Sequence, residues 1–134
     1  MLKSKLAQEE SKYGAQSIQA AKAQHAVANC AVELHDYKEA EAAFKAALPP
    51  IEDDPAQAAE LHLLLADFAS MYATTARLKE ADPLLSRACE LGKNSAAIAP
   101  LKQRKVMEDY ARLLYKLNRT QEADDLYKQL KAKP

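Results

Sequence analysis

Apolar side chains recur along this chain at steps of three and four residues, and polar residues, glycine or proline separate the apolar segments. That spacing places the apolar side chains on one face of an α-helix. The clearest stripe runs from Leu61 through Leu64, Leu65 and Phe68 to Tyr72. The pattern predicts helices over residues 2–13, 16–34, 37–48, 55–75, 78–91, 95–117 and 120–132. No window has the features of a β-strand bounded by turns, so the expected fold class is all-α.

Proline and glycine mark several of the expected helix ends. Pro49 and Pro50 should stop the helix before them, because proline has no N–H to donate to the helical hydrogen-bond ladder. Asp54 followed by Pro55 is a start signal, with the aspartate as N-cap and the proline in the first helical position. Gly92 is expected to end the helix over 78–91, as glycine commonly does.

One short sequence returns three times in altered form. Each copy consists of glutamate, alanine and an acid, at Glu39-Ala40-Glu41, Glu80-Ala81-Asp82 and Glu122-Ala123-Asp124. The central alanines are 41 and 42 residues apart (81 − 40 and 123 − 81). A fixed period of this size indicates stacked helix hairpins, each too small to bury its own apolar stripe.

The positions around this motif also repeat. Asp36 with Glu39 has the spacing of a capping box, and Glu80 and Glu122 stand where Glu39 does, at the third helical position. Asn118 occupies the turn that His35 and Ala76 occupy in the other copies. Asparagine tolerates the left-handed backbone that such a turn often needs.

With these features the chain resembles the tetratricopeptide repeat family, in the longer form of about 42 residues seen in kinesin light chains and bacterial repeat proteins. The resemblance rests on small residues in the first helices, early alanines in the second helices, and a large residue four positions later. These are Ala28, Ala69 and Ala111; Ala40, Ala81 and Ala123; and Phe44, Leu85 and Tyr127. It implies a right-handed superhelical solenoid of antiparallel helix hairpins.

The expected organisation is a single domain over residues 1–134. Its repeats are expected at 16–48, 55–91 and 95–132, and residues 2–13 form either a half-repeat or a capping helix. Two interpretations are equally compatible with this start of the chain: residues 2–13 are a capping helix, or the chain is a piece of a longer repeat array.

The resemblance also implies where a partner would bind. First helices of this family line a concave groove that holds a peptide or a helix of another protein. The residues expected on that face are Lys22, His25, Asn29, Leu63, Ala66, Ser70, Lys105, Glu108, Arg112, Tyr115 and Lys116.

The family's carboxylate clamp is not expected here. Asn29 and Lys105 fit that clamp, but His25, Asp67 and Asp109 stand where it has lysine, asparagine and a basic residue. Acids in such a groove would repel a carboxylate. The kinesin-type asparagine pair is also missing from the first helices.

The expected groove is therefore of mixed character. Its basic residues are Lys102, Arg104, Lys105, Arg112 and Lys116, and Leu63, Ala66 and Ala73 give it a more apolar middle. Such a surface could hold a partner segment with an acidic end. Alternatively, the charges only solvate a helix face and pair with each other, as Glu108 and Arg112 could at i,i+4.

Composition narrows the function classes. The 19 basic and 19 acidic side chains cancel, which argues against a nucleic-acid-binding surface. A helical-repeat RNA binder is thus a less favoured interpretation. The main alternative to a partner-binding scaffold is a structural fragment of a longer repeat array, which stacks or self-associates and has no ligand of its own. The expected state is a monomer or a weakly self-associating chain. No signal peptide or membrane-length apolar run is present, so a cytoplasmic location without membrane contact is expected.

No residue set points to catalysis, a metal or a cofactor. His25, His35 and His62 lack the spacing of a zinc site. Cys30 and Cys89 lie in apolar helical segments, where free thiols are buried and inert. Leu34 should continue the same buried stripe as Cys30. With only two glycines the chain has no phosphate-binding loop. The sequence therefore predicts a non-enzymatic protein-interaction scaffold.

Overall fold

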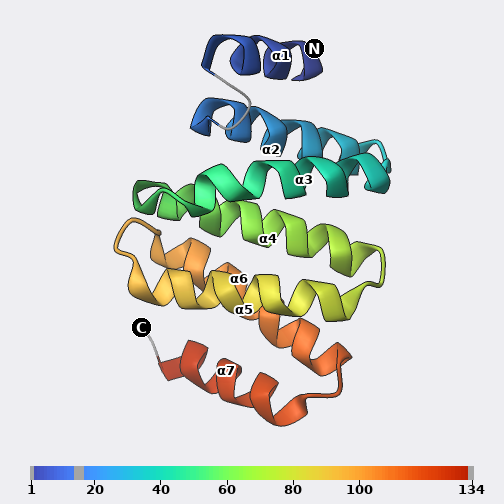
Figure 1. The fold of residues 1–134 in the computed structure, drawn as a ribbon. Coiled ribbons are helices and arrows are strands. Elements are labelled where there is room, and N and C mark those ends of the chain that lie inside the picture. The colour runs from blue at the N-terminus through green and yellow to red at the C-terminus, as the bar shows by residue number, and fades with distance from the viewer. Residues whose placement is uncertain (1, 14–16, 133–134) are drawn as a thin grey trace.

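The computed structural model describes residues 2–13 and 17–132. Within these ranges the fold is all-α. Each helix packs mainly against its neighbours in the chain, and successive helices run antiparallel (Figure 1). The helices are α1 (Leu2–Tyr13), α2 (Ile18–Glu33), α3 (Tyr37–Glu52), α4 (Ala58–Thr74), α5 (Leu78–Asn94), α6 (Pro100–Lys116) and α7 (Thr120–Ala132), with a short 3₁₀ turn, η1 (Pro55–Gln57), before α4.

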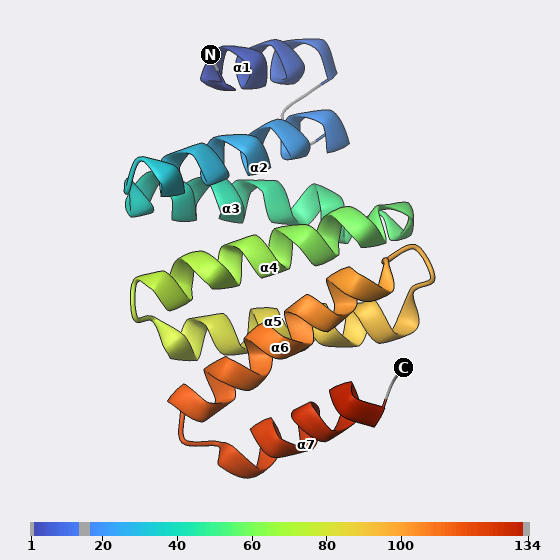
Figure 2. The same cartoon turned by 180° about the vertical axis from the view of Figure 1, so that it is seen from behind.

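The hairpins α2–α3, α4–α5 and α6–α7 stack one after another, and α1 lies over α2 (Figures 1 and 2). The first helix of the last hairpin, α6, crosses in front of α5 in Figure 2 and behind it in Figure 1. The first helices α2 and α4 also contact each other directly. This is the expected arrangement of antiparallel helix pairs in a repeat fold. None of the described helices combines the length and apolar composition that a membrane span requires.

The three hairpin turns are equivalent, as expected. His35, Ala76 and Asn118 have positive φ angles of 60°, 64° and 62°. In each turn the residue after the left-handed one donates its N–H to the carbonyl five residues before it. Arg119, for example, donates to the Leu114 carbonyl at 2.8 Å. Only a left-handed residue lets the chain close a helix in this way. The hydrogen-bond pattern thus determines the turn conformation, and non-glycine residues adopt the left-handed backbone in all three copies.

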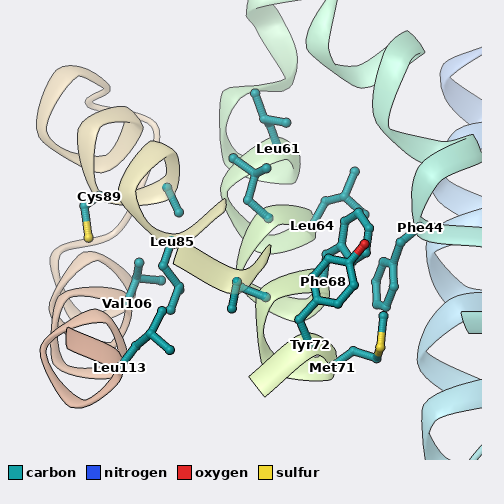
Figure 3. Packing of buried hydrophobic residues seen from close by; sticks show 14 of the residues in the cluster. Phe44, Leu61, Leu64, Phe68, Met71, Tyr72, Leu85, Cys89, Val106 and Leu113 are labelled. Atoms are coloured by element: carbon teal, nitrogen blue, oxygen red, sulfur yellow. The ribbon is translucent and has the colours of Figure 1, made fainter. Parts of the chain in front are cut away.

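The core is a continuous stack in which small and large side chains alternate. All six repeat alanines have 0% of their surface exposed, which lets neighbouring helices approach closely; they are Ala28, Ala40, Ala69, Ala81, Ala111 and Ala123. Phe44 stacks on Phe68 with ring centroids 5.0 Å apart, and Phe68 stacks on Tyr72 at 4.7 Å (Figure 3). Leu85 is buried in the second repeat, whereas Tyr127 in the third is half-buried.

The expected end of α3 at residue 48 is wrong. The helix continues through Pro49 and Pro50 to Glu52, and the Asp53 N–H donates to the Pro49 carbonyl at 3.2 Å. The added turn buries Ile51 completely. Burying a side chain of this size is worth about 1.5–3 kcal/mol, which helps to offset the hydrogen bonds that the prolines cannot donate.

Gly92 does not end its helix, since α5 continues to Asn94. A Cβ atom at Gly92 would lie 3.1 Å from Gln103 Cγ and 3.5 Å from His62 Nε2. The glycine therefore permits a close approach between α4, α5 and α6. The third long helix begins later than expected, at Pro100 in place of residue 95, with Ala99 as its N-cap.

Three further expectations need correction. Asp54 caps as expected by accepting from the Ala56 N–H at 3.0 Å, but it caps η1, and α4 begins only at Ala58. Leu34 is 73% exposed, because the chain turns there and carries its side chain out of the stack. Cys89 is buried, whereas Cys30 is half-exposed; both are free thiols.

Candidate partner-binding groove

The first helices α4 and α6 enclose two adjoining hollows of about 190 and 260 Å³, which we call the α4–α6 groove. Ala66, Ser70, Lys105 and Asp109 line both hollows. The other lining residues are His62, Leu63, Asp67, Ala69, Ala73, Leu85, Lys102, Val106, Arg112, Leu113 and Lys116. The groove is thus a feature of two helices that lie one repeat apart.

The sequence of each helix explains its wall of the groove. On α4 the small residues Ala66, Ser70 and Ala73 follow one another at steps of four and three, so they share a helix face and leave space above it. On α6 the same spacing brings long basic side chains to the wall; they are Lys102, Lys105, Arg112 and Lys116. The α4 wall is therefore low, with Asp67 as its charged residue, and the α6 wall is mainly basic.

Asp109 neutralises part of the basic wall. Its carboxylate lies 3.3 Å from Lys105 Nζ and also pairs with the guanidinium of Arg112. Glu108, which could have paired with Arg112, instead contacts Arg104 at 3.6 Å. The wall keeps more basic than acidic side chains, so its electrostatic potential favours an anionic group in the groove.

The structure brings six of the expected partner-binding residues together in this groove. These are Leu63, Ala66, Ser70, Lys105, Arg112 and Lys116. Glu108 and Tyr115 lie elsewhere on α6, on the side towards α7. Arg104, the partner of Glu108, donates to the Leu130 carbonyl of α7 at 3.0 Å, and Tyr115 stacks on Tyr127 of α7 at 5.9 Å.

The expected residues on α2 do not form part of the groove. Lys22 and Asn29 are exposed, but His25 is only 4% exposed. Its Nδ1 lies 2.8 Å from Glu60 and its Nε2 lies 2.7 Å from Asp67, both on α4. Because both ring nitrogens are occupied within the fold, His25 is not available to a partner.

The environment of His25 keeps its ring charged. Burial alone would lower the pKa of His25, but the hydrogen bonds with Asp67 and Glu60 outweigh burial and raise it to about 9. The same contact lowers the pKa of the Glu60 carboxyl. Asn29 adds a hydrogen bond of 3.1 Å to Asp67. These side chains join α2 to α4 through a polar network that sequence reasoning missed.

His62, at the edge of the groove, has the opposite electrostatic surroundings. Its side chain is 3% exposed, and its Nε2 is the one buried side-chain polar atom of the described residues without a hydrogen-bond partner. Burial and the nearby Lys102 hold the pKa of His62 below its ordinary value. A neutral imidazole therefore lies beside the basic wall.

The repeated motif supplies contacts between hairpins as well as helix starts. Asp36 accepts from the Glu39 N–H at 3.2 Å, but the Glu39 carboxylate pairs with Lys3 at 2.5 Å, so only half of the expected capping box forms. Glu80 and Glu122 bind the side chains of Arg77 and Arg119, the residues just before their helices. The motif's glutamates therefore act mainly through ion pairs.

Serial antiparallel helix pairs with a groove between first helices define a helical repeat protein with a TPR-like fold. Two solved structures of a protein from Podosopora anserina, described as a kinesin light chain with nearly identical TPR-like repeats, share this fold. One is of a substituted variant of that protein, with a TM-score of 0.72 over 98% of this chain and 62% of the other. The second has a TM-score of 0.71 over 98% and 63%.

Both structures are 19% identical to this chain in sequence, so the likeness concerns the fold. The chain spans less than two thirds of their length. No protein-family model matches the sequence, and no curated protein matches it.

Proposed function

We propose that this chain is a protein-interaction module whose α4–α6 groove binds an acidic segment of another protein, either extended or helical. The observation that carries the proposal is the pairing of a low wall of small residues on α4 with a basic wall on α6. Space and positive potential coincide in these two hollows, and an anionic side chain could enter between Lys105 and Lys116. The TPR-like fold supports the same role, since such folds generally serve as interaction scaffolds.

The physical properties of the groove suit a short segment. Its walls are helices held by a packed core, so little ordering is needed when a partner binds. Leu63, which is 42% exposed at the groove, offers an apolar contact beside the cations. The basic side chains would speed association and select acidic partners, and their contribution should fall with salt.

The proposed role is non-catalytic. Burial raises the pKa of the Cys89 thiol to about 11, which leaves almost no reactive thiolate at neutral pH. His25 is held as a cation between two carboxylates and so is not a free base. Among the described residues no group of three or more histidine, cysteine or acidic side chains is placed to hold a metal ion.

A random peptide library displayed on phage and selected against the immobilised chain tests the proposal. We expect the selected peptides to be enriched in Asp and Glu. Arg112→Glu should weaken their binding about tenfold or more, because an attractive contact becomes a repulsive one. Lys79→Glu, which makes the same charge reversal at an exposed lysine of α5, is the matched control and should leave binding unchanged. Selection without acidic enrichment, or equal binding by both variants, would contradict the proposal.

A further inference from the structure

His62 is a histidine that the fold buries without giving its ring a charged partner. Its side chain is 3% exposed, and its Nε2 has no hydrogen-bond partner among the described residues. Burying a polar group without a hydrogen bond costs free energy, and burying it as a cation costs far more. The fold therefore keeps this ring neutral, whereas the equally buried His25 lies between two carboxylates.

The ring lies where α4, α5 and α6 meet, which we call the α4–α5–α6 corner. A Cβ atom at Gly92 of α5 would lie 3.5 Å from His62 Nε2 and 3.1 Å from Gln103 Cγ of α6. The Gln103 side chain donates to the Ile98 carbonyl at 2.7 Å, and Ile98 is the buried residue of the connection between α5 and α6. His62 is thus packed against the residues that hold the end of α5 and the start of α6 in place.

The charged groups of α5 and α6 at this corner do not favour a protonated ring. Burial and, after it, Lys102 of α6 hold the pKa of His62 below its ordinary value. On α5, Glu90 lies 4.0 Å from Lys93, and both side chains are exposed. The thiol of Cys89 is neutral at and below neutral pH, because burial raises its pKa to about 11.

The carboxylates that line the same hollow as His62 already have partners. Asp67 of α4 lies 2.7 Å from the charged ring of His25. Asp109 of α6 pairs with two basic side chains of its own helix, and one of them is Lys105, which also lines the hollow. A proton on His62 would therefore find no unpaired carboxylate there while the corner stays closed.

We propose that His62 is an acid-sensitive switch whose protonation opens the α4–α5–α6 corner. The closed corner keeps the ring neutral and buried, and the open corner lets water hydrate the charged ring. Gln103 and Ile98 are released with it, because they are held in place beside the ring. The corner is also the end of the α4–α6 groove that contains Lys102, so opening loosens that part of the wall. The switch is a property of the free chain and requires no partner.

The switch acts between about pH 5 and pH 6.5. A histidine whose pKa is lowered in the closed state stabilises that state fully above the ordinary value of 6.5. This contribution is lost as the pH falls from there towards the lowered pKa, and each pH unit raises the open fraction up to about tenfold. His25 keeps its proton over this range, since its pKa is about 9. His35 is exposed at a turn, so its protonation requires no opening.

Amide hydrogen exchange of the unmodified chain at pH 7.0 and pH 5.5 tests the switch. The rates are read by NMR and corrected for the intrinsic pH dependence of exchange. We expect the amides of residues 90–94 and 101–106 to lose protection about fivefold between the two conditions, because the open corner binds an additional proton. The amides of α2 and α3 should keep their protection, since the ring does not belong to that hairpin.

His62→Gln removes the titrating ring and should abolish the pH-dependent loss of protection at the corner. His35→Gln is the matched control and should show the same loss as the unmodified chain. Titration of the His62 ring signals in the unmodified chain provides a check that needs no variant, and the pKa should lie below 6.5. A His62 pKa at or above 6.5, no loss of protection in the unmodified chain, or an equal loss with His62→Gln would overturn the proposal.

Discussion

His25 is a buried cation between two carboxylates, and it joins α2 to α4. A cation in this place is stable because Glu60 and Asp67 approach it from two sides at hydrogen-bonding distance. Removing one member of a buried charged set leaves the others without compensation, so its loss costs more than the loss of a surface pair. The first two repeats therefore depend on the protonation of one side chain.

This dependence predicts a loss of stability at alkaline pH. The pKa of His25 is about 9 in the fold, against 6.5 in the unfolded chain. A raised pKa in the folded state stabilises fully below the unfolded value, and the contribution is lost as pH rises through about 9. We expect urea unfolding to show a decline between about pH 7 and pH 10 that His25→Gln lacks.

The His25→Gln chain and the unchanged chain share their tyrosines, lysines and cysteines. The difference in unfolding free energy between His25→Gln and the unchanged chain at each pH therefore excludes the contribution of those groups. His35→Gln is a suitable control, because His35 is exposed at a turn and its ring hydrogen-bonds to the neighbouring Tyr37 hydroxyl at 2.9 Å. If the His25→Gln chain loses as much stability as the unchanged chain over this range, the ring is not the titrating group.

Ala81 shows how little space the helix contacts leave. It has 0% exposed surface at the point where α5 approaches its neighbours. Ala81→Leu should lower the free energy of unfolding by about 1–3 kcal/mol, because the larger side chain can be placed only by moving a helix. Chemical denaturation measures this. Ala42→Leu, at an exposed position of α3, should change stability by less than about 0.5 kcal/mol.

At the scale of the element, α5 contains a proline after its first turn. Pro83 is exposed, cannot donate to the Lys79 carbonyl, and sits well inside Leu78–Asn94. Pro83→Ala should therefore stabilise the protein by about 1–2 kcal/mol. The restored helical hydrogen bond stabilises the folded state, and the greater conformational entropy of the unfolded chain offsets part of this gain. Thermal unfolding of the variant measures this. A lower melting temperature would show that the proline ring contributes packing that outweighs the missing bond.

The sequence pattern correctly predicts which segments are helical, but it does not predict where some of the helices end. The turn at Asn118 is recognisable from its residue type, and the copies then identify His35 and Ala76 as equivalent. The end of α3 depends on the burial of Ile51, and the end of α5 on the space that Gly92 leaves for His62. Those reasons lie in tertiary packing, which the local pattern of residues does not contain.

The candidate groove was predictable to the same limited extent. Helical spacing places Lys105, Arg112 and Lys116 on one face, and the structure has them at the groove. His25 has the same spacing on α2, yet it is buried, because its partners lie 35 and 42 residues further along the chain. A single helix face does not reveal such contacts with the next repeat.

At the scale of the whole molecule, stability comes from packing within each hairpin and between consecutive hairpins. Each helix packs mainly on its neighbours in the chain, so a change at one junction should have little effect on another. The acids Glu41 and Asp82 have no partner in common, although each holds an arginine and a tyrosine of the following hairpin. The two junctions are therefore separate sites of the same kind.

Glu41→Gln and Asp82→Asn keep the shape of each acid and remove its charge, so each should lower the midpoint of thermal unfolding by a few degrees. The double variant should show the sum of the two changes in free energy within about 0.5 kcal/mol, because independent sites add. Urea unfolding of the four chains in this cycle measures the coupling. A loss in the double variant that clearly exceeds the sum would mean that the junctions cooperate across the middle hairpin α4–α5. The nearest-neighbour description of this fold would then fail.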